Sequence, residues 1–540
     1  MTARPSRRAP PLAPLLVGLA LAALLIAALE LGLRLAGYGP SPGDFYFARL
    51  GERILEPEMY EGHPRRFFTL RADYRHSPAH AGPNAVGSWP FRGRPLAPAP
   101  ADLWTVAVLG DSCAYGLPLP ANQALPARLD HHLRESGIEA LVANLGVPGY
   151  TTVQIRALLD EVLAEHAPDE VVLYPAAWND QAPALGHDDV ELRERAENPG
   201  LLRRSALIAL LRGEPGQPAE EGTAAPAPSD EERERGTRVP EEAVEGELRA
   251  MIHACRERGV GVVLIVPPHP PRTRSSHARM FRDAETVRRV AGEEGVDAVD
   301  LQPLLDEGLG EDAFFADLVH PAPTGVDLLA VEAAGLLLAR APAAPSHAAL
   351  AVRSFEPTEV PELGDLELKL RLDGWTSDAP LPAVTVAGAP LLDLRAHETD
   401  GVRGTLPHVG PGPCTVVVQT STAVAVAAEP LIVRAPSIEW LAGEPPRVRV
   451  RSRAGDAARV LVARELREHA KHSSRGGYRL VDEALLPLHL TMELGADGTG
   501  EATVRKAPAE RPLYLQALIV PAGEPEDSDF AVWSAVTTVP

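Results

Sequence analysis

The chain has 540 residues, a formal net charge of −22 and a pI of about 5.3, a balance that argues against a nucleic-acid partner. Its length predicts several domains. Only three cysteines are present, and neither their number nor their spacing to histidines is that of a disulfide framework or a metal site. We therefore expect a globular, multidomain protein that uses no metal or other cofactor.

The N-terminal residues resemble a membrane-targeting segment. Arg4, Arg7 and Arg8 lie in a basic stretch, residues 1–8, and the uncharged Leu- and Ala-rich stretch 9–29 follows. A helix of about 20 residues crosses a hydrocarbon core of about 30 Å, and a basic flank favours the cytoplasmic side. We predict a transmembrane signal anchor at 9–29, with the rest of the chain outside the bacterial cytoplasmic membrane. A cleaved signal peptide is the alternative, although its apolar region is normally only about 7–15 residues long.

After a lead-in region at 37–101, residues 102–342 alternate short apolar runs with helix-period segments. Thr152–His166 and Glu241–Arg258 each repeat apolar residues on one helical face. This alternation predicts a parallel sheet covered by helices, whose ligands bind beyond the carboxyl ends of the strands. Five runs rich in Val, Leu and Ile are the expected strands: Leu103–Leu109, Ala140–Asn144, Glu170–Tyr174, Val260–Val266 and Val296–Leu301.

Side chains suited to nucleophilic catalysis follow the ends of these strands. Ser112 ends the motif Gly110-Asp111-Ser112 after the first strand, and Asp317-x-x-His320 lies beyond the last strand. A serine hydroxyl needs a base to take its proton, and the base needs a group that orients it. The turn Asn144–Gly149 offers backbone amides and Asn179 offers a side-chain amide, the donors that a developing oxyanion requires. Each piece alone is also found in an ordinary turn or helix cap, but all of them follow strand ends.

With these residues in place, the chain from Leu103 to Arg340 resembles the SGNH (GDSL-type) hydrolases. The resemblance implies a three-layer α/β/α, flavodoxin-like fold with Ser112 as nucleophile, His320 as general base and Asp317 as its orienting group. It also implies an oxyanion hole formed by the amides of Ser112 and Gly149 and the side chain of Asn179. One position departs from the family pattern: the glycine usually found two residues before the asparagine is Ala177 here.

Other nucleophiles and other hydrolase classes fit less well. The α/β-hydrolase elbow requires Gly-x-Ser-x-Gly, but Ala114 occupies the position of the second glycine. Chymotrypsin-like and subtilisin-like chains place Asp and His before the serine, whereas here both follow it. Cys113 is a rival nucleophile beside Ser112, but we interpret it as a small buried side chain. The pair His131-His132 is interpreted as part of a solvated helix face.

The remaining regions are assigned by composition and alternation. The lead-in contains Asn84–Gly93, which resembles the Asn…Gly-x-Arg segment of membrane-anchored bacterial SGNH proteins. Residues 213–242 carry few large apolar side chains and are expected to form a disordered insertion. Residues 349–434 resemble IPT/TIG immunoglobulin-like modules, and 436–540 are expected to form a second β domain. The expected β strands of the two units are Leu366–Leu372, Ala383–Ala387, Cys414–Gln419, Arg447–Arg451, Ala458–Ala463, Leu488–Leu494 and Leu513–Ile519.

The sequence therefore predicts an SGNH-type serine esterase that acts on acyl esters of envelope glycans or lipids. A polysaccharide O-acetyltransferase is the first alternative, because the same acyl-enzyme can pass its acyl group to a sugar hydroxyl. A surface binding protein with an inert SGNH-like domain is the second. The expected partners are an acylated carbohydrate or lipid substrate and, through residues 9–29, the membrane.

Overall fold

The computed structural model describes most of the chain, and the fold is built from these parts of it. They are residues 12–35, 57–75, 86, 90–96, 103–184, 188–197, 207, 236–308, 310–342, 350–361, 366–421, 423–441, 447–452, 456–463, 466–472, 478–481, 489–495, 498–503, 513–520, 532–533 and 537–539.

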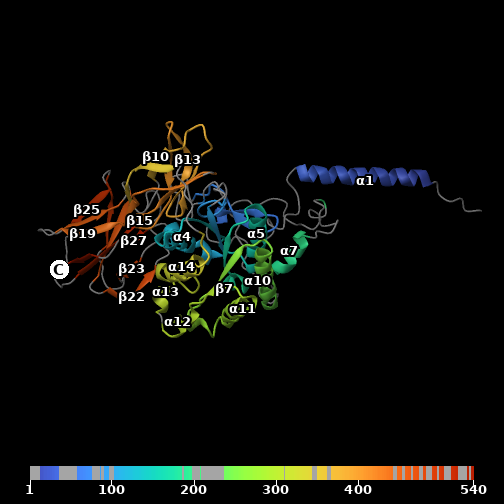
Figure 1. Cartoon of the computed structure of the whole chain (residues 1–540), viewed down its shortest axis with the longest axis horizontal. Coiled ribbons are helices and arrows are strands. Elements are labelled where there is room, and N and C mark those ends of the chain that lie inside the picture. The colour runs from blue at the N-terminus through green and yellow to red at the C-terminus, as the bar shows by residue number, and fades with distance from the viewer. Residues whose placement is uncertain are drawn as a thin grey trace, which may run out of the picture.

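A five-stranded, fully parallel sheet lies at the centre of the α/β part (Figure 1). Its spatial order is β4-β3-β5-β6-β7, which is the doubly wound order 2-1-3-4-5 when the strands are counted along the chain. The switch point of this order lies between β3 and β5, and ligands of open α/β sheets bind beyond the strand ends at such a point. The strands are β3 (Trp104–Gly110), β4 (Ala140–Gly146), β5 (Glu170–Tyr174), β6 (Gly261–Ile265) and β7 (Asp297–Val299).

Helices cover both faces of the sheet and enclose two cores. Neighbouring residues of β3 point to opposite faces: Ala107 and Leu109 enter one core, and Val106 and Val108 enter the other. The first core is closed mainly by α5 (Thr152–Glu165), α10 (Glu241–Arg256) and α11 (Ala278–Glu294), and the second by α4 (Leu125–Glu135) and α14 (Pro323–Leu338). The predicted layered α/β fold is thus confirmed, and all five predicted strands form. Shorter helices are α3 (Ser112–Tyr115), α6 (Ala177–Asp180), α7 (Asp189–Glu197), α12 (Gln302–Asp306) and α13 (Glu311–Phe314).

The N-terminal region forms helix α1 (Leu12–Leu35). Within the described part of the chain, no helix has both the length and the apolarity needed to cross a membrane. The transmembrane anchor predicted at 9–29 is therefore not confirmed.

The lead-in region contributes a hairpin, β1 (Tyr60–His63) with β2 (Phe67–Leu70), and a buried segment at 90–96. Half of the Asn84–Gly93 motif, residues 84, 85 and 87–89, lies outside the described residues. The insertion predicted at 213–242 is corrected at its end, because residues 236–242 are folded. Arg238 and Val239 in this part are 3% and 0% exposed. The polar composition of the insertion did not predict this burial, because it depends on hydrogen bonds of Arg238 to residues elsewhere in the chain.

The C-terminal half is built of β sheets. Two four-stranded sheets, β13-β14-β10-β8 and β12-β11-β16-β17, share one core. Inward residues of β10 such as Leu368 and Leu370 meet Val384 and Val386 of β11 in that core, so the expected sandwich forms. One small sheet departs from the expected antiparallel pattern, because β9 (Glu359–Pro361) pairs in parallel with β18 (Leu431–Arg434). The IPT/TIG assignment itself is not confirmed.

The strands of this first β unit are β8 (Ala351–Glu356), β10 (Leu366–Asp373), β11 (Ala383–Val386), β12 (Ala389–Pro390), β13 (Leu392–His397), β14 (Gly401–Leu406), β15 (Gly412–Cys414), β16 (Val416–Gln419) and β17 (Val424–Val426), besides β9 and β18. The unit packs directly on the α/β part. Arg94 donates to the Gln419 side chain at 3.0 Å, and the amide of Gly410 donates to Asn122 at 2.7 Å.

The last region is also a β unit, as predicted. Its two main sheets are β19-β20-β25 and a five-stranded sheet around β21 and β26, and they share a small core. The strands are β19 (Ser437–Leu441), β20 (Arg447–Arg451), β21 (Ala457–Ala463), β22 (Leu466–His472), β23 (Tyr478–Val481), β24 (His489–Glu493), β25 (Thr499–Thr503), β26 (Leu513–Val520), β27 (Val532–Trp533) and β28 (Thr537–Val539).

Candidate active site

The turn after β3 carries Ser112 at the first position of the short helix α3. Gly110 is required there, because a Cβ atom at this position would lie 2.6 Å from the Cβ of Ala114 and 2.8 Å from the Tyr174 carbonyl oxygen. Asp111 caps the helix by accepting a hydrogen bond from the Cys113 amide at 2.9 Å. The tight turn leaves Ser112 8% exposed at the rim of the sheet.

Three predicted residues form a continuous hydrogen-bond chain. The Oγ atom of Ser112 lies 2.8 Å from Nε2 of His320, and Nδ1 of His320 lies 2.6 Å from Oδ2 of Asp317. Helix α3 and the loop before α14 supply these groups from positions 208 residues apart in the chain. A serine, an imidazole and a carboxylate in this order are the arrangement that activates a serine for attack on a carbonyl.

The carboxylate of Asp317 is fixed by more than the imidazole. Its other oxygen accepts hydrogen bonds from the backbone amides of Val319 and His320, at 2.7 and 2.8 Å. Burial favours the neutral carboxyl, but the hydrogen bonds from His320 and from these amides outweigh it and lower the pKa of Asp317. Asp317 therefore stays ionised near neutral pH, which favours the tautomer of His320 with its hydrogen on Nδ1 and the lone pair of Nε2 facing the Ser112 hydroxyl.

Asn179 is oriented by the aspartate that precedes the serine. Its side-chain nitrogen donates to Oδ2 of Asp111 at 3.0 Å. Burial raises the pKa of Asp111 to about 6, against the opposing effects of the Cys113 amide and of His320. A side-chain NH2 carries two hydrogens, so one is held by Asp111 and the second is available to a substrate oxygen. Ala177, the departure from the family pattern, is accommodated because it lies in helix α6, a backbone conformation that does not require glycine.

Gly149 lies in the loop after β4, beside the turn that carries Ser112. Strand β4 pairs with β3 up to Gly146, opposite Gly110, and the Val147 amide then donates to the Gly110 carbonyl at 3.1 Å. Gly149 itself has a φ of +84°, a conformation that favours glycine. Its carbonyl accepts a hydrogen bond from the guanidinium of Arg238 at 2.8 Å. The hydrogen bond from Arg238 thus fixes the loop that carries the predicted oxyanion amide.

A buried polar network joins this loop to the one that carries Asn179. Asp180 accepts hydrogen bonds from the amide and the hydroxyl of Thr152, at 2.8 and 2.5 Å. Arg238 also donates to Gln154 at 2.7 Å and pairs with Asp189 at 3.1 Å. Its neighbour Val239 donates its amide to the Asp180 carbonyl at 3.0 Å. These hydrogen bonds therefore connect the loop after β4 to the loop after β5.

Asp180 makes this network sensitive to pH. Burial raises the pKa of Asp180 to about 8, against the lowering effect of the Thr152 hydrogen bonds. The folded state therefore binds the proton more tightly than the unfolded state, and the free energy of unfolding falls as the pH rises from 3.8 to about 8. Asp180→Asn keeps an oxygen for the Thr152 amide and removes the ionisation. We expect this variant to show a flatter dependence of Tm on pH between 4 and 8.

The matched control for this measurement is Asp306→Asn, because Asp306 is an exposed carboxylate paired with Arg274. It should leave the pH dependence of Tm as in the wild type. An Asp180→Asn variant whose Tm changes with pH as steeply as the wild type would contradict the assignment.

Two buried arginines that support the site were not anticipated. Arg92 donates to the carbonyls of Tyr115 and Leu119, at 3.1 and 2.8 Å, and so stabilises the chain just after Ser112. Arg238 braces the Gly149 loop. The lead-in motif, which ends in Phe-Arg-Gly, could have indicated a role for Arg92. Arg238 follows a polar stretch that contains no motif, so the sequence offered no indication of its role.

Cys113 does not compete with Ser112. It is 4% exposed, and its thiol lies 3.7 Å from the Val319 carbonyl oxygen. Burial, reinforced by Asp111 and Asp317, raises the pKa of this thiol well above its usual range. Since the thiolate is the reactive form, the side chain acts here as a small packing group.

A sequence match identifies this part of the chain as a GDSL-type (SGNH) hydrolase domain, in agreement with the parallel sheet and the residues at its strand ends. The protein is an enzyme that hydrolyses ester bonds. The match is to the GDSL-like Lipase/Acylhydrolase family over residues 108–328. No functionally curated protein matches the chain at a significant level.

Solved structures resemble part of the chain at low identity. The lipase/acylhydrolase from Enterococcus faecalis is 20% identical and aligns with 45% of this chain and 100% of its own, with a TM-score of 0.31. A variant of an acetyl xylan esterase from Geobacillus stearothermophilus is 17% identical and aligns with 44% of this chain and 97% of its own, with a TM-score of 0.29.

Proposed function

We propose that the protein is a serine esterase that removes acetyl or other acyl groups from envelope glycans or lipids, with Ser112, His320 and Asp317 as its catalytic triad. The observation that carries the proposal is the hydrogen-bond chain from the Ser112 hydroxyl through both imidazole nitrogens of His320 to Asp317. Its position at the switch point of the sheet is where substrates of open α/β sheets bind.

In the proposed reaction, Nε2 of His320 takes the proton of Ser112 as Oγ attacks the ester carbonyl. The tetrahedral intermediate carries its negative charge on the former carbonyl oxygen, which the amides of Ser112 and Gly149 and the Asn179 side chain stabilise. The imidazolium returns the proton to the departing alcohol, and the acyl group stays on Ser112. His320 then activates a water molecule, which releases the acid and restores the serine.

Asn179→Ala tests the oxyanion donor. The donor acts on charge that exists only in the transition state, so we expect kcat for a chromogenic acyl ester to fall about 10²–10³-fold while KM stays nearly unchanged. Steady-state kinetics measure both constants. Gln181→Ala, two residues further on, is the control and should leave kcat as in the wild type. A rise in KM at constant kcat would assign Asn179 to ground-state binding instead.

The acceptor of the acyl group separates hydrolysis from transfer. We propose water, with an O-acylated glycan or lipid as the natural ester. The test incubates the enzyme with a labelled acetyl donor, with and without an oligosaccharide acceptor. Free acetate in both reactions supports the esterase. Label on the oligosaccharide would show an O-acetyltransferase that uses the same acyl-enzyme.

We also propose that the enzyme acts outside the bacterial cytoplasmic membrane, held there by its N-terminal segment. The proposal is supported by the basic residues before the apolar stretch 9–29 and by the exposed apolar side chains of α1, such as Leu24 and Leu25, which are 66% and 71% exposed. We expect activity to fractionate with membranes and to resist a high-salt wash, because burial rather than charge would hold the segment. Full activity in the soluble periplasmic fraction, with a new N-terminus after residue 29, would show cleavage instead.

A further inference from the structure

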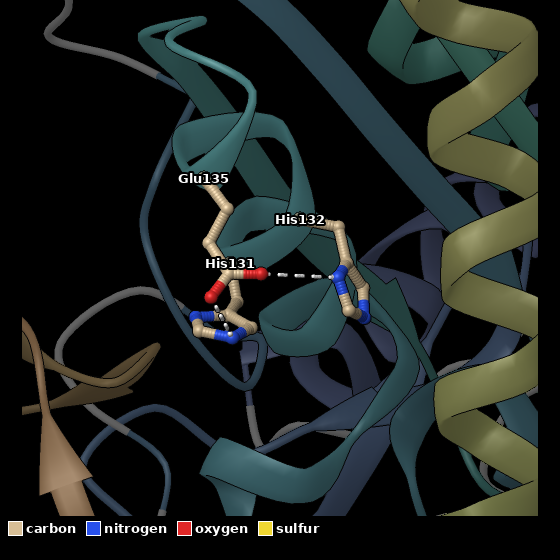
Figure 2. Close-up of side chains that lie close together, drawn as sticks. All are labelled: His131, His132 and Glu135. Atoms are coloured by element: carbon tan, nitrogen blue, oxygen red, sulfur yellow. Dashed lines mark ion pairs between the residues drawn. The ribbon is translucent and has the colours of Figure 1, made fainter.

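We propose that His131, His132 and Glu135 on helix α4 bind a divalent transition-metal ion, with Zn²⁺ as the best fit. The three side chains converge on one side of the helix, and Figure 2 shows both imidazoles turned toward the Glu135 carboxylate. Nε2 of His131 lies 3.3 Å from one carboxylate oxygen, and Nδ1 of His132 lies 3.6 Å from the other. One ligand atom from each residue lies within 4.8 Å of the others.

The two nitrogen–oxygen separations, 3.3 and 3.6 Å to different oxygens of Glu135, are close to those of a small tetrahedral ion, and the set of three ligand atoms lies within 4.8 Å. Zinc binds histidine nitrogen at about 2.0–2.1 Å and carboxylate oxygen at about 2.0–2.2 Å, so neighbouring ligand atoms of a tetrahedral site lie about 3.3–3.5 Å apart. Two nitrogens and one carboxylate oxygen are also the donors that zinc and its neighbours in the periodic table prefer over Mg²⁺ or Ca²⁺. Three protein ligands leave a fourth position for water or an outside group.

A second, independent feature is the carboxylate behind His132. Oδ1 of Asp327, on helix α14, lies 2.9 Å from Nε2 of His132, and Asp327 is itself held by Arg128 at 2.7 Å. Histidines that ligate metals commonly donate their other ring N–H to a carboxylate, which fixes the tautomer and raises the basicity of the ligating nitrogen. Here Asp327 keeps the hydrogen on Nε2 and leaves the lone pair of Nδ1 facing Glu135.

That arrangement calls for positive charge between the groups. A metal ion between the lone pair of Nδ1 and the facing carboxylate oxygen would bind both groups. The sequence did not suggest the site, because adjacent histidines match no common ligand spacing. The contact between Asp327 and His132, which the fold brings about, could not be seen in the sequence. All three ligands lie on α4, and the contact between His132 and Asp327 connects the site to α14, the helix that begins three residues after His320.

The test is zinc binding to the full-length chain. After treatment with a chelator, the protein is titrated with ZnCl2 at pH 8 by calorimetry, and its Tm is measured over the same concentrations. We expect one saturable site and a rise in Tm that a chelator reverses. His131→Ala and Glu135→Gln should each weaken binding at least tenfold, and Asp327→Asn should weaken it about 10–100-fold.

Two further variants exclude other sites. His253 makes a single ion pair with Glu294 on another helix pair, so His253→Ala should leave zinc affinity unchanged. His320→Ala should also retain the zinc-dependent rise in Tm, which distinguishes this site from the triad and makes the result independent of the proposed reaction. Glu135 is an exposed side chain (61%), so Glu135→Gln reports on binding without endangering the fold. No zinc binding by the wild type, or equal affinity in wild type, His131→Ala and Glu135→Gln, would overturn the proposal.

Discussion

Ser112→Ala is expected to lower kcat for a chromogenic acyl ester by about 10⁶-fold, because the acyl-enzyme cannot form without the hydroxyl. The replacement removes one polar atom from the helix α3 turn and leaves Gly110 and the cap by Asp111 in place, so the Tm should change little. The residual rate should stay above that in water, since the oxyanion donors remain.

Cys113→Ala is the matched control for this variant. Cys113 is the adjacent, buried thiol, and its loss removes no group from the hydrogen-bond chain of Ser112, His320 and Asp317. It should retain activity, measured as kcat with the same ester. Loss of turnover in Cys113→Ala together with full turnover in Ser112→Ala would show that the thiol, not the hydroxyl, attacks the ester.

Asp317→Asn is expected to lower kcat by about 10⁴-fold. One oxygen of Asp317 accepts from the amides of Val319 and His320, and the asparagine oxygen must take that place because an NH2 group cannot accept. The NH2 group then faces Nδ1 of His320 and donates to it, which moves the ring hydrogen to Nε2. The imidazole then presents an N–H to Ser112 and cannot take its proton.

The geometry of this variant separates the tautomer effect from unfolding. Since both backbone hydrogen bonds to residue 317 persist, the Tm of Asp317→Asn should stay close to that of the wild type. Activity is measured as kcat across pH 6–9. A fall in kcat of less than tenfold would contradict the role of Asp317 as the group that orients His320.

The α/β fold was predictable from the sequence because its strands are short apolar runs buried on both faces. Strand β5 was placed to the residue, whereas β3 and β4 extend to Gly110 and Gly146 because pairing continues through the glycine. The end of the insertion was misplaced: Arg238 reads as a polar loop residue, and only its tertiary partners Asp189, Gln154 and Gly149 show that it is buried. The alternation of apolar and polar residues predicted the β strands of the C-terminal half. It did not predict the parallel pairing of β9 with β18, because these strands are far apart in the chain.

The candidate site shows the same division. The side chains proposed to carry the chemistry stand in short motifs at strand ends, so Ser112, Asp317, His320 and Asn179 could be named as candidates from the sequence. The groups that hold them, such as Arg92 beneath the nucleophile turn and Asp180 against Thr152, interact across loops. Spacing along the chain carries no information about such pairs.

Labelling with a serine-directed fluorophosphonate tests the central claim most directly. An activated serine attacks the phosphorus and becomes permanently modified, whereas ordinary serines do not react. Digestion and mass spectrometry of the labelled wild-type protein should place one modification on Ser112, and Asp317→Asn should label far more slowly. A folded wild-type protein that takes up no probe, or a Ser112→Ala variant that is labelled as fast as the wild type, would contradict the assignment of Ser112 as the nucleophile.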